Sequence, residues 1–86
     1  MYQILLTKQA EKSFSLLMSS NPKMGKRVAS AIDSLAKNPE NGTALKGDLA
    51  GFLKYRVGSY RLIYCIKRDK LVVTVIDIGH RREIYR

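Results

Sequence analysis

The sequence predicts a single α+β domain over residues 1–86, in which an N-terminal strand and a helical hairpin precede a three-strand antiparallel meander. Two observations predict this class. Apolar residues recur at helical spacing between residues 8 and 35, and they alternate at strand spacing with polar residues between residues 53 and 57. A chain of 86 residues has room for only one core. We therefore expect the helices to pack on one face of a mostly antiparallel sheet.

The front half of the chain contains one strand and two helices in this interpretation. Residues 2–7 (YQILLT) form a short apolar run whose length favours a strand. Helical spacing follows over residues 8–20, and the Asn21-Pro22 pair ends this helix and caps the next. The second helix is predicted from apolar residues three or four positions apart, namely Met24, Val28, Ala31, Ile32 and Leu35. The turn NPENG at 38–42 closes the hairpin.

The back half reads as three strands that follow the loop ALKGDLAG at 44–51. Lys54 and Arg56 alternate with apolar residues, which places both bases on one side of a strand over 53–57. Gly58-Ser59 is typical of a two-residue hairpin loop. Further strands are predicted for YRLIYCI at 60–66 and, after the turn KRDK, for LVVTVIDIG at 71–79.

The composition is that of a folded soluble protein, with 45% hydrophobic and 27% charged residues. The single cysteine, Cys65, excludes a disulfide within the chain and a cysteine-rich metal site. The N-terminus has no signal-peptide pattern, and no apolar run is long enough to span a bilayer. These features predict a cytoplasmic protein without a membrane partner.

The charge of the chain is its most unusual property. There are 16 lysines and arginines against 7 acidic residues, which gives a net charge of +9 and favours a polyanionic partner such as nucleic acid. Residues 52–86 carry 9 of the bases and only 3 of the acids, so a functional site is expected in the C-terminal part.

Basic and aromatic residues converge on the predicted sheet face that the helices leave uncovered. Lys54, Arg56, Arg61 and the arginines of the tail GHRREIYR would gather there. Taken singly, each of these bases is explained equally well as a solvated surface charge or as part of a binding site. Several cations on one surface, however, repel each other unless a polyanion binds. Tyr85, among arginines, has the setting of a ring that stacks on an unpaired RNA base, or of a strand aromatic at the edge of the core.

RNA cleavage at such a site would have to proceed without a metal or another cofactor. His80 is the only histidine, which excludes a two-histidine mechanism, and its expected place in a turn is more typical of a surface residue. The carboxylates Asp69, Asp77 and Glu83 are too dispersed to hold Mg²⁺. The remaining candidate base is Lys54, whose proton would leave more readily among guanidinium groups that also stabilise the transition state.

The segments LKYRVGSYRLIYCI and LVVTVIDIGHRREIYR, with the helical front half, resemble the RelE/ParE superfamily of toxins from type II toxin–antitoxin pairs. The most specific parts are the Y-R-[LV]-I-Y strand after a hairpin and the G-[HK]-R-x-x-[IV]-Y ending. In the RelE branch this resemblance implies a ribosome-dependent mRNA endonuclease (mRNA interferase) that cleaves the codon in the ribosomal A site through its 2′-hydroxyl and so inhibits translation.

The resemblance also implies roles for individual residues. Lys54 is similar to the proposed general base of the family, Arg61 to the arginine that stabilises the transition state, and Arg81 to the proposed general acid. Tyr85 is similar to the tyrosine that orients the mRNA base, so these four form the predicted catalytic set. Further RNA contacts are expected from Arg56, His80, Arg82 and Lys46.

The chain departs from the family pattern at two positions. Phe52 stands where RelE has a second lysine, and His80 stands where a family member has lysine and could supply the acid.

A ParE-like protein of the same fold that inhibits DNA gyrase is the alternative function, and a simple RNA-binding module is a third hypothesis. The toxin hypotheses imply a cognate antitoxin with an acidic wrapping segment, and operator DNA contact only through the toxin–antitoxin complex; the RelE branch also implies a ribosome carrying mRNA.

Overall fold

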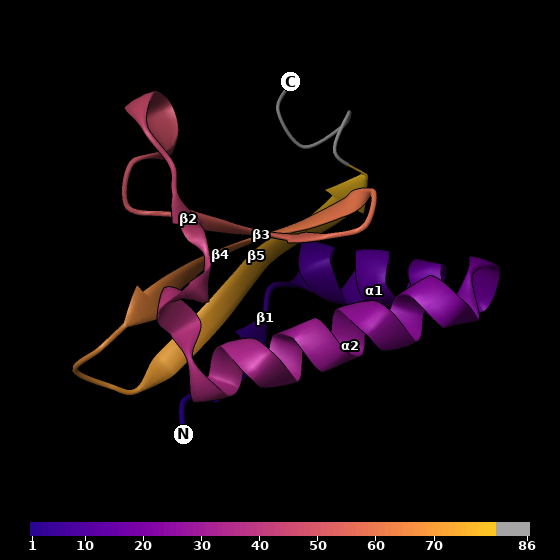
Figure 1. Ribbon diagram of the computed structural model, residues 1–86, viewed down its shortest axis with the longest axis horizontal. Coiled ribbons are helices and arrows are strands. Elements are labelled where there is room, and N and C mark those ends of the chain that lie inside the picture. The colour runs from indigo at the N-terminus through magenta and orange to yellow at the C-terminus, as the bar shows by residue number, and fades with distance from the viewer. Residues whose placement is uncertain (81–86) are drawn as a thin grey trace.

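Strands and helices follow one another in the predicted order in the computed structural model, which describes residues 1–80 (Figure 1). The elements are β1 (Gln3–Leu6), α1 (Lys8–Ser20), α2 (Pro22–Lys37), β2 (Thr43–Ala44), β3 (Leu53–Val57), β4 (Tyr60–Lys67) and β5 (Val72–His80). Short 3-10 helices, Pro39–Asn41 and Gly47–Leu49, flank β2. The predicted α+β class is confirmed.

The sheet has the order β1-β5-β4-β3-β2, and both helices lie on the same side of it (Figure 1). Neighbouring strands from β2 to β5 are antiparallel, whereas β1 pairs with β5 in parallel. The helical hairpin carries the chain from β1 at one edge to β2 at the other, and the meander then returns to β1. The parallel strands β1 and β5 are therefore joined by a long connection, as a parallel pair requires.

The two helices begin at side-chain caps that the sequence indicates. The Thr7 hydroxyl accepts a hydrogen bond from the backbone N–H of Ala10 (3.1 Å) at the start of α1. The Asn21 side chain accepts from the N–H of Met24 (3.2 Å) at the start of α2, where Pro22 occupies the first turn. The predicted use of the Asn21-Pro22 pair is therefore confirmed.

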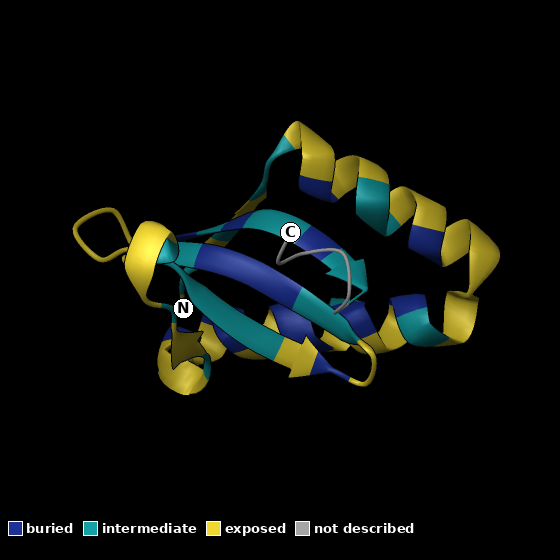
Figure 2. Cartoon of the chain, turned by 90° about the horizontal axis from the view of Figure 1, so that it is seen from above, coloured by how far each residue is buried: buried dark blue, intermediate teal, exposed yellow. Residues whose placement is uncertain are grey.

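The core lies between the helices and the sheet, and the outward faces of both helices are exposed (Figure 2). Tyr64, at the centre of β4, is fully buried, while Tyr55 and Tyr60 pack against the core. The fully buried apolar side chains on both layers include Leu35, Val28, Leu62, Val73 and Val75. Burial of this kind is the main favourable term in folding.

Three details differ from the sequence prediction. Ala44 was expected in a loop and Thr43 was assigned to no element, but together they form β2 and pair with Leu53 and Lys54. Leu71 was expected in the last strand, but it lies in the preceding turn with a φ of 55°. His80 was expected in a turn, but it is the last residue of β5.

Within residues 1–80, no helix is long and apolar enough to cross a membrane.

Candidate active site

Lys54, Arg56 and Arg61 lie together on the face of the sheet opposite the helices. Arg56 and Arg61 are directly paired across β3 and β4, and Lys54 is two positions from Arg56, which puts it on the same side of the strand. The three side chains and Thr43 line a cavity of about 300 Å³. The structure thus brings three of the predicted bases together.

The cavity lies beside the central strand of the sheet, β4. Ile63 lies opposite Lys54 in β4 and is only 5% exposed, and Asp77 lies opposite Ile63 in β5. The Asp77 carboxylate accepts a hydrogen bond from the backbone N–H of Ile78 (2.9 Å). Within this row of paired residues, the apolar side chain of Ile63 therefore lies between Lys54 and the Asp77 carboxylate.

Thr43 reaches the cavity because the chain before it is fastened to the sheet. The buried Tyr64 hydroxyl donates to the carbonyl oxygen of Pro39 (2.7 Å). Burial of this hydroxyl raises the pKa of Tyr64, and a hydrogen bond with the Gly42 backbone partly opposes that rise. At Gly42 a Cβ would clash with the Tyr64 hydroxyl and would lie 2.8 Å from the Lys54 carbonyl oxygen, so the close approach requires glycine.

Sequence reasoning missed Thr43 as a lining residue. Its strand, β2, spans only two residues, which is too short for an alternating pattern to be read. The signal that could have indicated it is Gly42, which marks a close backbone approach just before it.

His80 lies on the other side of the sheet from Lys54. It is paired with Tyr60, and the two rings meet edge to face with centroids 5.7 Å apart. Ser13 and Leu16 of α1 line the same small cavity as these two rings. The structure therefore does not bring His80 together with the three bases.

A β-bulge explains why His80 faces the helices. Ile63 pairs with Asp77 and Tyr64 pairs with Val75, so Ile76 has no partner in β4. Val75 and Ile78 both face the core, and the extra residue between them reverses the alternation. Strict alternation from Val75 would have turned His80 outward, whereas the bulge turns it inward.

The other predicted site residues lie outside this cluster or outside the described residues. Lys46 is exposed and precedes the 3-10 helix Gly47–Leu49, and it does not line the cavity. Arg81, Arg82 and Tyr85 fall in residues 81–86 and lie outside the described part of the chain. In that part, no three histidine, cysteine or acidic side chains are grouped so that they could hold a metal ion.

The chain is similar to toxins of type II toxin–antitoxin systems. Residues 4–85 match the family described as "ParE toxin of type II toxin-antitoxin system, parDE". Toxin RelG of Mycobacterium tuberculosis is 37% identical over 60 residues, which are 69% of each chain. These two matches show the family by sequence alone.

Solved structures confirm the fold. The RelBE2 toxin–antitoxin complex from M. tuberculosis contains a chain that matches with a TM-score of 0.82 and 27% identity, covering 93% of this chain and 98% of that chain. The YoeB/ParE toxin from Agrobacterium tumefaciens has a TM-score of 0.83 at 19% identity, covering 92% of this chain and 98% of that chain. At that identity the second likeness supports the fold alone.

Together, the fold and these matches define a toxin of a type II toxin–antitoxin system. Within this class the chain belongs to the RelE/ParE superfamily, as its motifs predicted, and its sequence matches the ParE toxin family over nearly its whole length.

Proposed function

We propose that this toxin is a metal-independent endoribonuclease that cleaves mRNA codons in the ribosomal A site and so inhibits translation. The observation that carries the proposal is the cluster of Lys54, Arg56 and Arg61 around one cavity on the uncovered sheet face. Such a cluster provides charge for a phosphate whose negative charge increases in the transition state.

The reaction consists of an attack by the 2′-hydroxyl on the neighbouring phosphorus. In the proposed mechanism Lys54 accepts the proton of that hydroxyl while the new P–O bond forms. Arg61 stabilises the pentacoordinate phosphate, and the bond from phosphorus to the 5′-oxygen breaks. Arg81 is the proposed donor of a proton to that oxygen, and Tyr85 is the proposed stacking partner of the base.

Arg56 and the remaining predicted bases serve in binding. Arg56 is exposed beside the cavity and is proposed to contact a phosphate of the mRNA or rRNA. Lys46, Arg82 and His80 stay proposed RNA contacts. For His80 this requires contact from the α1 side, where its ring meets Tyr60.

The proposed partners are the ribosome with mRNA and a cognate antitoxin in the cytoplasm, with operator DNA contacted only through the antitoxin complex. RelBE2 of M. tuberculosis and RelBE of Escherichia coli are both toxin–antitoxin complexes, which supports an antitoxin partner for this chain. A basic surface also favours an acidic segment in that partner.

A ParE-like inhibitor of DNA gyrase is the second candidate, because the matched family carries the ParE name. The two candidates differ in what stops first after induction. Arrest of translation with new codon-linked mRNA ends supports the endonuclease, whereas arrest of replication with intact mRNA supports the gyrase inhibitor.

The proposal is tested by mapping mRNA 5′ ends after induction and by primer extension on translating ribosomes. Wild type is compared with Arg61→Ala, Arg81→Ala and Tyr85→Ala. Lys70→Ala is the control, because Lys70 is exposed in the turn after β4 and lies away from the cavity. New cuts should appear with wild type and Lys70→Ala only. A folded wild type that produces no cuts within codons on ribosomes would contradict the proposal.

A further inference from the structure

Phe52 lies immediately before β3 and continues its pairing with the neighbouring strand. The backbone N–H of Leu45 donates to the Phe52 carbonyl oxygen (2.9 Å), which extends the ladder between β2 and β3 by one residue beyond Ala44 and Leu53. Successive side chains of a strand point to opposite faces of the sheet. Phe52 therefore shares a face with Lys54, two positions further on.

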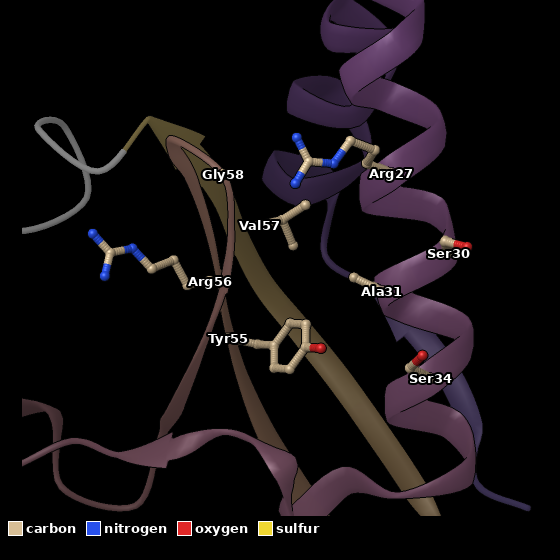
Figure 3. A pocket seen from close by; sticks show the side chains of 8 residues that line it. All are labelled: Arg27, Ser30, Ala31, Ser34, Tyr55, Arg56, Val57 and Gly58. Carbon is tan, nitrogen blue, oxygen red and sulfur yellow. The ribbon is translucent and has the colours of Figure 1, made fainter.

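The alternation is visible within β3. Figure 3 shows the Tyr55 ring pointing toward α2, whereas Arg56 leaves the strand on the side away from α2. Among the described residues, the partly buried hydrophobic ones that pack against the core include Leu53 and Tyr55 but not Phe52. Phe52 is itself partly exposed, so it offers an accessible aromatic side chain on the face that carries the cavity.

This face has an apolar part beside a cationic part. Ile63 is paired with Lys54, so it lies on the same face, and it is only 5% exposed. Cys65 is two positions further along β4 and is partly exposed. Beyond Lys54 in the other direction along β3 lie the two paired arginines of the cavity. Lys54 therefore marks the boundary between apolar side chains, with Phe52 among them, and guanidinium groups.

An unpaired nucleotide is divided in the same way. Its phosphate carries negative charge, whereas its base has an apolar face that stacks on aromatic side chains. The Cα atoms of Phe52 and Lys54 are about 7 Å apart if the strand is fully extended. A ribose whose 2′-hydroxyl lies at Lys54 can therefore carry a base that reaches Phe52.

We propose that Phe52 is a positioning residue of the cleavage site and stacks on the base of the nucleotide whose 2′-hydroxyl attacks. The scissile phosphate, on the 3′ side of this nucleotide, would lie at Arg61. A base has two faces, so this role is compatible with the stacking role proposed for Tyr85. The inference rests on the proposed function, because it takes RNA as the ligand and Lys54 as the group beside the hydroxyl.

A purely structural role for Phe52 is the competing explanation. A ring that packs beside Ile63 and Cys65 would shield the sheet from water without contacting RNA. The two roles differ in one measurable respect, because only stacking depends on the presence of a base in the RNA.

The test is a thermodynamic cycle between Phe52 and the RNA bases. The two probes are a short oligoadenylate and the same chain in which stable abasic ribose units replace the adenosines. Calorimetry at low salt measures their affinities for the intact protein. Phe52→Leu, which keeps apolar bulk but lacks the ring, should bind the oligoadenylate at least about fivefold more weakly than wild type. Both proteins should bind the abasic chain equally, and Phe52→Tyr, which keeps a ring, should bind both probes as wild type does.

Phe14→Leu is the matched control. Phe14 is also partly exposed, but it belongs to α1 and packs against the core on the other face of the sheet. The same loss of a ring there should leave the affinity for both probes unchanged.

Three binding results would overturn the inference. They are equal binding of the oligoadenylate by wild type and Phe52→Leu, equal losses by Phe52→Leu for the two probes, and an equal loss of oligoadenylate affinity in Phe14→Leu. The second result would assign Phe52 the structural role.

Cleavage on programmed ribosomes separates this inference from the proposed function. We expect Phe52→Leu to lower kcat/KM by at least about fivefold and Phe52→Tyr to restore it. Wild-type protein that produces no cuts would contradict the proposed function itself. Cuts by wild type and Phe52→Leu with equal kcat/KM would overturn the role of Phe52 and leave the proposed function in place.

Discussion

Lys54 has the most specific chemical role among the described residues of the proposed site. It shares the cavity with two arginines and lies opposite the buried Ile63, so its position is fixed by the centre of the sheet. Of the four residues that line this cavity, Lys54 is the one that carries an amine, so we assign the proposed role of general base to it.

Lys54→Met keeps most of the side-chain length and removes the amine. If Lys54 is the general base, single-turnover cleavage on programmed ribosomes should slow by about 10²- to 10⁴-fold. Lys70→Met, outside the cavity, is the control for lost charge and should cleave at the wild-type rate. A Lys54→Met protein that folds and cleaves normally would remove Lys54 from the mechanism.

Tyr64 has a structural role that a pH titration can isolate. Its hydroxyl donates to the Pro39 carbonyl oxygen at 2.7 Å, and Tyr64→Phe leaves that acceptor without this donor. We expect a loss of about 1–3 kcal/mol in the free energy of unfolding at neutral pH. Urea unfolding measures it, and an unchanged midpoint and slope would contradict the role.

The same variant should differ from wild type in alkaline solution. Burial raises the pKa of Tyr64 in the folded state above its unfolded value of 10.0. Above that value the unfolded tyrosine loses its proton first, so the stability from this group is complete below it and is lost as pH rises toward the folded pKa. Tyr64→Phe lacks this ionisation, and its deficit in unfolding free energy should therefore shrink as pH rises above about 10.

Thr7 links the start of α1 to the bulge in β5. Its hydroxyl accepts from the N–H of Ala10 and donates to the carbonyl oxygen of Ile76 at 2.7 Å. Ile76 is the extra residue that turns Ile78 and His80 toward the helices. One side chain thus stabilises both a helix terminus and the irregularity that decides which residues of β5 face the core.

Thr7→Val keeps the shape of the side chain and removes both hydrogen bonds. We expect a loss of about 1–2 kcal/mol in the free energy of unfolding, the size of a lost helix cap. Thr7→Ser retains the hydroxyl and should recover most of this loss. NMR should also show faster amide exchange around Ile76 in Thr7→Val, and unchanged exchange there would mean that the bulge does not depend on Thr7.

The whole molecule shows which features a sequence can predict. The helices and the side of β3 that carries Lys54 were predictable because their apolar spacing follows a single period. The direction of His80 was not, because LVVTVIDIG is apolar nearly throughout and does not mark the residue at which the bulge reverses the alternation. The two-residue β2 was missed since its position depends on Tyr64 and Gly42, which are distant from each other in the chain.

The charge distribution of the molecule is expected to have opposite effects on folding and on the proposed binding of RNA. Arg56 and Arg61 face each other directly across two strands, and like charges in that arrangement oppose folding. The net charge of +9 adds a general repulsion. The same charges attract phosphates and release counterions when RNA binds.

Added salt should therefore stabilise the isolated protein and weaken the proposed RNA complex. Screening reduces the repulsion between the arginines, so the melting temperature should rise with sodium chloride. The affinity for a single-stranded RNA should fall as salt is added. In a plot of the logarithm of the association constant against the logarithm of the salt concentration, the line should become less steep by about 0.7 for each phosphate contact removed. Arg56→Gln should reduce both the rise in melting temperature and the fall in RNA affinity, whereas Lys70→Gln, in the turn between β4 and β5, should leave the salt dependence of RNA affinity unchanged.

Two outcomes would contradict this prediction. Equal salt dependence of RNA affinity for wild type and Arg56→Gln would show that Arg56 contacts no phosphate. A melting temperature that falls with salt would show that repulsion among these charges does not limit stability.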